Sequence, residues 1–246
     1  MHWSRLAKLK DRHLGGRCVI VANGPSLNRM DLSFLRSEHV IGMNKIYLGF
    51  SRMRFYPRYY VVVNPKVAEQ SDALIRSMNC VKFVGAAAAR AASLQEDALT
   101  YIVNTDNPPA RFSTDLVQGL HEGWTVTHMA LQVAYHLGYS DVVLIGLDHR
   151  YSYQGLPNDE AVMEGPDTNH FSDHYFGYGQ RWDNPDLVQS EVSYRAALQA
   201  YVADGRRIRD ATLDGVCTVF PKVDHTTLFA THAPMSMTSN NPVPCA

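Results

Sequence analysis

The sequence predicts an α/β fold with a doubly wound, mostly parallel sheet of the Rossmann-like kind. Three short apolar runs with the length of buried strands occur within the first 65 residues, and they lead into Asn23, Asn44 and Asn64 at their ends. Farther along, a helical pattern stops at Gly138 and leads directly into an apolar run at 141–147. Helix, glycine stop and buried strand in succession are the rhythm of βαβ units, which build parallel sheets.

The first strand is expected at 18–22, where the apolar run breaks at once into Asn23-Gly24-Pro25-Ser26. Gly24 can take backbone angles closed to other residues and permits a close approach to the main chain. Pro25 and Ser26 suit the cap and first turn of a helix, whose free N–H groups would face a bound anion. An ordinary strand-to-helix connection could contain the same residues.

The next two apolar runs, at 40–44 and 59–65, carry Asn44 and Asn64 at their ends. In an open parallel sheet ligands bind beyond the carboxyl ends of the strands, so the three asparagine amides would line one crevice. Asparagine is also a frequent turn residue, and each of the three could be no more than that.

The remaining elements follow the same alternation. The clearest helix covers 128–136; Thr125 or Thr127 can cap it, and its N-terminus is a second expected anion site. The strand after it ends at Asp148. We expect further helices at 66–79 and 185–204, further strands at 81–84, 99–103, 206–212 and 216–220, and a mobile loop at 104–122.

Residues 149–184 have little periodicity and are rich in histidine, tyrosine and acidic side chains, as in an active-site insertion or lid. His170 or His174, held beside the tyrosines, would suit a general base. Their spacing also matches two metal ligands on a helix, but nearby glycines disfavour a helix, and the sequence contains no Asp-x-Asp pair. We therefore expect a site without metal. The histidines could instead be structural hydrogen-bonding groups in the lid.

Charge is distributed unevenly along the chain. Residues 1–58 contain eleven Lys and Arg and three Asp and Glu, although the formal net charge of the chain is −1. This basic segment could attract a phosphorylated ligand, or it could be a solvated face that rests on an anionic membrane surface or glycolipid. Nucleic acid is a weaker interpretation, because the aromatic residues do not interleave with the basic ones.

The composition fits one nucleotide-binding α/β domain over 1–224, with the lid at about 149–184 and a flexible tail over 225–246. Four scattered cysteines predict reduced thiols and neither a zinc site nor a disulfide framework. The chain has no apolar stretch long enough for a membrane span and no secretion signal core, so we expect it in the cytoplasm, or peripheral to the inner membrane. The sequence does not indicate an oligomeric state.

Several blocks, in their order and spacing, resemble the bacterial family-42 sialyltransferases: V-I-V-A-N-G-P-S-L at 19–27, M-N-K-I-Y at 43–47, V-N-P at 63–65, T-V-T-H-M-A-L-Q-V-A-Y-H-L-G-Y at 125–139, L-I-G-L-D at 144–148 and H-Y-F-G at 174–177. With N-H-F at 169–171 and G-R-R-I-R-D-A-T at 205–212, they resemble even more closely the bacterial branch of the 6-hydroxymethylpterin diphosphokinase-like (MptE-like) family, which is similar to the flagellin nonulosonate transferases.

The resemblance implies a GT-A-like sialyltransferase type of fold and a set of ligand contacts. Thr125 and Thr127 would sit by the cytidine or its phosphate, and Tyr151 and Tyr153 lie near, but not in register with, two tyrosines that support the departing phosphate. Tyr178 stands where the second histidine of an H-Y-x-G-H motif is catalytic, so His170 or His174 takes over, or the reaction differs. The nucleotide and its sugar would contact the block residues Asn23, Gly24, Pro25, Ser26, Asn44 and Asn64, with Asp148 beside them.

The function we favour is metal-independent, inverting transfer of a nonulosonic-type sugar from a CMP-activated donor to a glycan or glycolipid acceptor, without a cofactor. A histidine would remove the acceptor proton, while tyrosine hydroxyls and helix N–H groups stabilise the departing phosphate. One alternative is ATP-dependent pyrophosphate transfer to a hydroxymethylpterin, with Mg²⁺ held by carboxylates such as Asp148. Another is a nucleotide-binding module without catalysis, which Tyr178 would explain.

Overall fold

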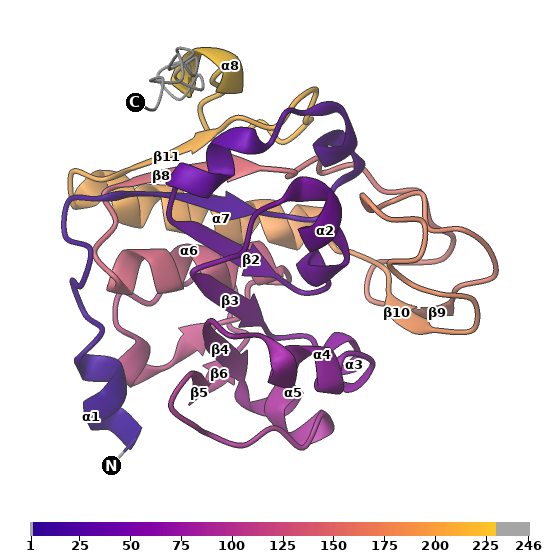
Figure 1. Cartoon of the computed structure of the whole chain (residues 1–246), viewed down its shortest axis with the longest axis horizontal. Coiled ribbons are helices and arrows are strands. Elements are labelled where there is room, and N and C mark those ends of the chain that lie inside the picture. The colour runs from indigo at the N-terminus through magenta and orange to yellow at the C-terminus, as the bar shows by residue number, and fades with distance from the viewer. Residues whose placement is uncertain (1, 230–246) are drawn as a thin grey trace, which may run out of the picture.

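The structure, a computed structural model, describes residues 2–229, with side chains from residue 5 onward. Its centre is a seven-stranded parallel sheet in the order β11-β8-β1-β2-β3-β4-β5 (Figure 1). The chain winds outward from β1 to β5 and then returns to place β8 and β11 on the other side of β1. This reversal confirms the doubly wound α/β prediction. The strands are β1 (Arg17–Val21), β2 (Val40–Met43), β3 (Tyr59–Val62), β4 (Val81–Gly85), β5 (Thr100–Val103), β8 (Asp141–Ile145) and β11 (Arg207–Asp210).

Successive side chains of a strand point to opposite faces of the sheet, and each face packs into its own apolar cluster. Ile20 and its neighbour Leu144 lie in one apolar cluster, under α6 (Val126–His136), α7 (Leu187–Ala203) and α1 (His2–Ala7). Val19 and Val143 lie in the cluster on the opposite face. That face is covered by η1 (Pro25–Arg29), η2 (Ser33–Ser37), η3 (Ile46–Gly49), α2 (Phe50–Met53), α3 (Pro65–Glu69), α4 (Asp72–Ser77) and α5 (Ala86–Ala91).

Several predicted elements differ from the observed ones. The helix predicted at 66–79 is two short helices, α3 and α4, since Ser71 interrupts it. The strand predicted at 216–220 is wrong: the chain there is irregular, and only Lys222 forms a single bridge to Asp210. The tail predicted from 225 begins with α8 (His225–Leu228), and the Phe229 ring stacks on Phe34 at 3.9 Å between centroids. Residues 230–246 lie outside the described residues.

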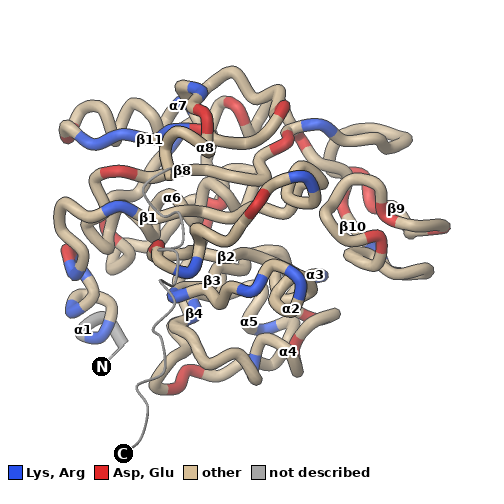
Figure 2. Tube along the Cα trace, turned by 45° about the horizontal axis from the view of Figure 1, so that its top comes forward, with Lys and Arg blue, Asp and Glu red and all other residues tan. Residues whose placement is uncertain are grey.

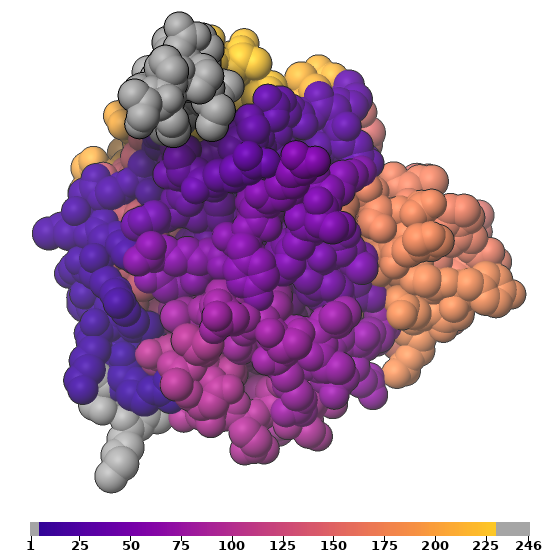
Figure 3. Space-filling model, in the orientation of Figure 1, coloured from indigo at the N-terminus to yellow at the C-terminus, as the bar shows by residue number. Residues whose placement is uncertain are grey.

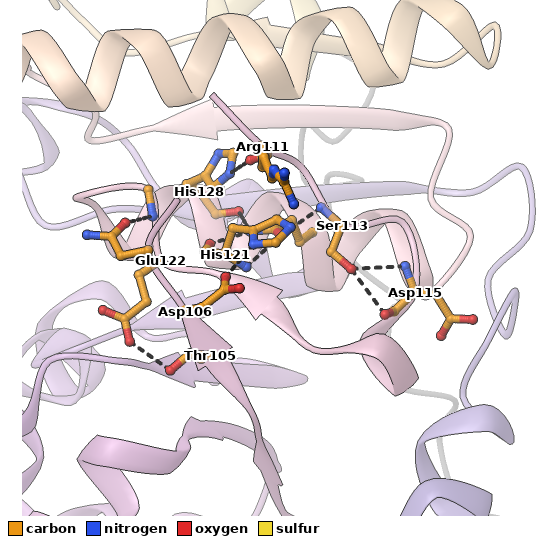
Figure 4. Close-up of polar contacts among 11 residues, drawn as sticks. Thr105, Asp106, Arg111, Ser113, Asp115, His121, Glu122 and His128 are labelled. Carbon is orange, nitrogen blue, oxygen red and sulfur yellow. Dashed lines mark hydrogen bonds and ion pairs between the residues drawn. The ribbon is translucent and has the colours of Figure 1, made fainter. Parts of the chain in front are cut away.

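The connection at 104–122, which we expected to be a mobile loop, is held by buried polar side chains of α6 (Figure 4). Gln132 accepts hydrogen bonds from the backbone N–H groups of Ser113 and His121, at 2.9 and 3.0 Å, and donates to the His121 carbonyl at 2.7 Å. His128 pairs with the Arg111 carbonyl at 2.8 Å. These contacts order β6 (Thr105–Asp106), η4 (Leu116–Gln118) and β7 (Leu120–His121).

The insertion at 149–184 forms a lobe that projects beside the sheet (Figures 1 and 3). It contains the antiparallel pair β9 (Glu160–Val162) and β10 (Arg181–Asp183), and no helix occurs in this fully described stretch. Lys66 of α3 forms ion pairs with both Asp183 and Glu160, and Trp182 is buried. Ion pairs and apolar packing thus hold the lobe against the domain.

None of the helices within residues 2–229 combines the length and the apolar character that a membrane span requires.

Candidate functional site

A cavity of about 410 Å³ lies at the carboxyl ends of β1, β2, β3 and β8. The strand order reverses between β1 and β8, which is the place where open α/β sheets bind ligands. The structure therefore gathers, from distant parts of the chain, most of the predicted site residues. Those that line the cavity are Asn23, Gly24, Asn44, Asn64, Thr125, Thr127, Asp148, Tyr151 and His170.

The turn after β1 is closed against Asp148. A Cβ atom on Gly24 would lie 1.9 Å from Asp148 Oδ2 and 2.6 Å from the Gly146 carbonyl oxygen, so the position admits only glycine. Gly24 has φ −70°, and its role is therefore space, which corrects our expectation of an unusual backbone angle. Ser26 donates to Asp148 from its backbone N–H at 3.0 Å and from its hydroxyl at 2.6 Å.

These bonds also correct the expected anion site at this turn. The N–H group of Ser26 is taken by Asp148, the Ser26 side chain is buried outside the cavity, and Pro25 has no N–H to offer. Burial raises the pKa of the Asp148 carboxyl group above its ordinary value, although the bonds from Ser26 oppose that shift. The carboxylate of Asp148 therefore occupies the position at this turn where we had expected a bound anion.

Two asparagines at the cavity have unused acceptors. Asn23 donates from Nδ2 to the Met43 carbonyl at 3.3 Å, but its Oδ1 is buried without a hydrogen-bond partner in the described part of the chain. Oδ1 of Asn44 is also buried without a hydrogen-bond partner in the described part of the chain. Asn44 has φ +48°, a backbone angle that asparagine tolerates better than most residues. Buried oxygens of this kind are normally satisfied, so both are candidates for contacts to a ligand.

Asn64 has a structural task instead. Its Oδ1 caps α3 by accepting from the N–H groups of Lys66 and Val67, at 2.8 and 3.2 Å. Its Nδ2 lies 3.5 Å from Asp183 of the insertion. The amide oxygen of Asn64 is therefore used as a helix cap, as expected of an ordinary turn residue.

The N-terminus of α6 borders the cavity. Thr125 caps the helix through a 3.3 Å bond from the Thr127 N–H to Thr125 Oγ1, which confirms it as the cap. The N-terminus of a helix of eleven residues carries a partial positive charge that favours a phosphate group. Tyr194 of α7 places its hydroxyl 3.2 Å from Thr125 Oγ1 and also lines the cavity. The sequence offered no signal for Tyr194 beyond its position in a helix.

Two histidines line the cavity, His149 and His170. Nε2 of His149 lies 3.3 Å from Glu191 Oε1, and the histidine predicted as a base is His170. Its Nδ1 lies 2.8 Å from Oδ2 of the buried Asp167, and its ring stacks on Tyr175 at 3.8 Å. Asp167 is itself fixed, because its Oδ1 accepts from the Asn169 N–H at 2.8 Å. His170 Nε2 has no hydrogen-bond partner among the described residues. A carboxylate that holds Nδ1–H leaves Nε2 free to accept a proton.

Three other predicted residues do not reach this cavity. The side chain of His174 is 86% exposed, and Tyr178 is 84% exposed, so both point to solvent at the lobe. The irregular backbone of 170–174 places the two histidines apart, whereas a helix would have put them on one face. Tyr153 donates to the Pro185 carbonyl at 3.2 Å and does not line the cavity. Tyr151 does line it, and burial raises its pKa to about 12, so its hydroxyl remains a donor at neutral pH.

The basic segment at the N-terminus does not supply the cavity with charge. Figure 2 shows its Lys and Arg residues at α1, on β1 and beside α2. Arg17 pairs with Glu38 at the amino end of the sheet, opposite the cavity. Arg150 is the cation that lines the cavity, together with four acidic residues that are engaged elsewhere: Glu122 with Thr105 (Figure 4), Asp148 with Ser26, Asp183 with Lys66, and Asp186 as the cap of α7.

Residues 1–154 match the model of a family described as 6-hydroxymethylpterin diphosphokinase MptE-like. Among solved structures, the MAf glycosyltransferase from Magnetospirillum magneticum AMB-1 is similar, with a TM-score of 0.54 and 13% sequence identity. The alignment covers 91% of this chain and 38% of that one, so the chain spans well under half of that protein's length. At this identity the likeness establishes a common fold. No curated protein matches the sequence.

Proposed function

We propose that this chain, which belongs to the 6-hydroxymethylpterin diphosphokinase MptE-like family, transfers a sugar from a nucleotide-activated donor with inversion. The observation that carries the proposal is the convergence on one cavity of a base and of groups suited to a leaving phosphate. The base is His170 with Asp167, and the phosphate groups are the α6 N-terminus, Thr125 and Tyr194. The name of the structurally similar MAf protein supports the same reaction class.

The reaction would proceed as a single displacement. His170 Nε2 accepts the proton of an acceptor hydroxyl, whose oxygen forms a bond to the anomeric carbon as the bond from that carbon to the phosphate oxygen breaks. Asp167 holds the ring and stabilises the imidazolium that forms. The negative charge on the departing phosphate is received by the first turn of α6 and by neighbouring hydroxyl groups.

We further propose that the donor is a CMP-activated nonulosonic acid and that the acceptor is a glycan or glycolipid. The donor follows from the resemblance of the sequence blocks to sialyltransferases. Asn23 Oδ1 and Asn44 Oδ1 support it, because these unpaired acceptors suit amino or hydroxyl groups of the nucleotide and its sugar.

The name of the family also raises pyrophosphate transfer from ATP, which would need Mg²⁺ held by carboxylates. Among residues 5–229, whose side chains the structure describes, no group of three or more His, Cys, Asp or Glu side chains is arranged to hold a metal ion. Both oxygens of Asp148, the carboxylate we had considered for this role, accept hydrogen bonds from Ser26. Asp148 is therefore already engaged by the protein, and we derive no step through a magnesium ion.

Titration calorimetry with CMP and with ATP, each with Mg²⁺ and with EDTA, tests the proposal. We expect CMP to bind with the same affinity in both conditions, because the contacts to its phosphate come from the protein. Magnesium-dependent binding of ATP without binding of CMP would contradict the proposal and favour the pyrophosphokinase. If CMP binds but the protein releases none from CMP-N-acetylneuraminic acid, the chain is a non-catalytic binding module.

A further inference from the structure

A second cavity, of about 570 Å³, lies on the other side of the turn after β1. Gly24 lines the first cavity and Pro25 lines the second. His170 is the one residue that lines both cavities among the residues described. The side chain with the free imidazole nitrogen therefore forms part of the boundary between two separate spaces.

The walls of the second cavity are fixed by hydrogen bonds between the turn and the insertion. The Phe171 N–H donates to the Asn23 carbonyl at 2.9 Å, and Asn28 Nδ2 donates to the Phe171 carbonyl at 2.9 Å. Phe171 itself is buried. These bonds hold the segment around His170 against η1, so the second cavity is a built feature of the fold.

Arg52 is the cation of this second cavity. Its guanidinium donates to Asn28 Oδ1 and lies 5.9 Å from the centre of the Phe171 ring. Within residues 2–229 it forms no ion pair with a carboxylate, so several of its N–H donors remain available. Thr168 and Ser172 add hydroxyl groups, and the half-exposed Leu48 adds an apolar wall. Asp167 and Asp173 add carboxylate acceptors. One charged donor, acceptors, hydroxyls and a small apolar surface together suit a saccharide.

We propose that this second cavity binds the acceptor saccharide, whose hydroxyl or carboxylate oxygens accept hydrogen bonds from Arg52. The assignment rests on the proposed glycosyl transfer. Inversion requires the acceptor hydroxyl to approach the anomeric carbon from the side opposite the departing phosphate. A base on the boundary between a donor cavity and a second cavity meets this requirement, because it touches the acceptor hydroxyl at the place where the two substrates meet.

Nuclear magnetic resonance of histidine-labelled protein, saturated with CMP, tests the assignment. The His170 ring signals are identified by their loss in His170→Gln. Methyl β-D-galactopyranoside serves as a neutral probe and the methyl α-glycoside of N-acetylneuraminic acid as an acidic one. We expect at least one of them to shift the His170 signals in a saturable way; the acidic probe alone would indicate a carboxylate at Arg52, and the neutral probe alone hydroxyl contacts.

Two variants locate the effect. Arg52→Leu is expected to weaken saccharide binding about tenfold or more, because a charge-assisted hydrogen bond is lost, and Leu48→Trp to abolish it by filling the cavity. CMP affinity should be unchanged in both. The matched controls are Arg90→Leu and Leu74→Trp, at exposed positions that line neither cavity.

The proposal is overturned if neither saccharide shifts the His170 signals, or if Arg52→Leu and Leu48→Trp respond like the wild-type protein. Failure of the wild-type protein to bind CMP would be a separate result, which would count against the donor site and the proposed function.

Discussion

Replacing His170 by alanine is expected to lower turnover of CMP-N-acetylneuraminic acid about a thousandfold while CMP affinity stays near the wild-type value. His170 borders the cavity, and Asp167 lies 2.8 Å from its Nδ1, so Nε2 is the base that we propose for deprotonation of the acceptor. Asp167→Asn keeps the volume but removes the charge that stabilises the imidazolium, and turnover should fall about a hundredfold. Steady-state release of CMP, followed by chromatography, measures both effects.

His174→Ala is the matched control for this prediction. His174 lies four residues farther along the same lobe, is 86% exposed and does not line the cavity, so its removal should leave turnover unchanged. A large loss in His174→Ala together with normal turnover in His170→Ala would show that the wrong histidine has been assigned as the base. Normal turnover in both variants would remove His170 and His174 from the mechanism and leave His149 as the histidine at the cavity.

Gly24→Ala is expected to lower the free energy of unfolding by about 3 kcal/mol, at the upper end of the usual cost of overpacking. The new methyl group would lie 1.9 Å from Asp148 Oδ2, and Asp148 can move only by breaking its bonds to Ser26. The displaced carboxylate would also disturb the cavity, so CMP binding should weaken as well. Urea unfolding followed by circular dichroism measures the change in stability.

Gly165→Ala is the control, because a Cβ at Gly165 meets no atom within 4 Å and the substitution should be nearly neutral. The double variant Gly24→Ala with Asp148→Ala should regain only part of the loss, since the Gly146 carbonyl oxygen would still lie 2.6 Å from the new methyl group. If Gly24→Ala is as stable as the wild-type protein, the space between Gly24 and Asp148 can open to admit a methyl group, and the packing argument for Gly24 is wrong.

Most of the sheet could be predicted because its inner strands are buried on both faces and therefore consist of largely apolar runs. The run at 141–147 and the glycine stop at Gly138 illustrate this: α6 ends next to Gly138, whose φ is +90°, and β8 follows directly. The edge strand β11, with the sequence Arg-Ile-Arg-Asp, is the exception. The predicted strand at 216–220 failed for the opposite reason. It has apolar residues of strand-like composition, but Val216 is exposed, and Cys217 and Phe220 are buried by packing in the cluster beneath α7 and not by pairing in the sheet.

The site could be predicted most directly where regular strands and the start of α6 position it. Asn23 and Asn44 follow strands, and parallel strands present their carboxyl ends at the same edge, so their convergence followed from the fold class. In the insertion, by contrast, the apolar residues follow neither helical nor strand periodicity, so the sequence does not indicate which side chains point inward. The sequence therefore could not separate His170 from the exposed His174. The partnership of Asp167 with His170 depends on an irregular loop path, and its only trace in the sequence is a spacing of three residues.

The most direct test of the account is the position of CMP in a crystal of its complex with the protein. We expect the nucleotide in the cavity beyond β1 and β8, with its phosphate at Thr125 and the first turn of α6 and with His170 on the opposite side of the reacting centre. A phosphate bound at Arg52, in the second cavity, or anywhere away from the carboxyl ends of these strands would contradict it.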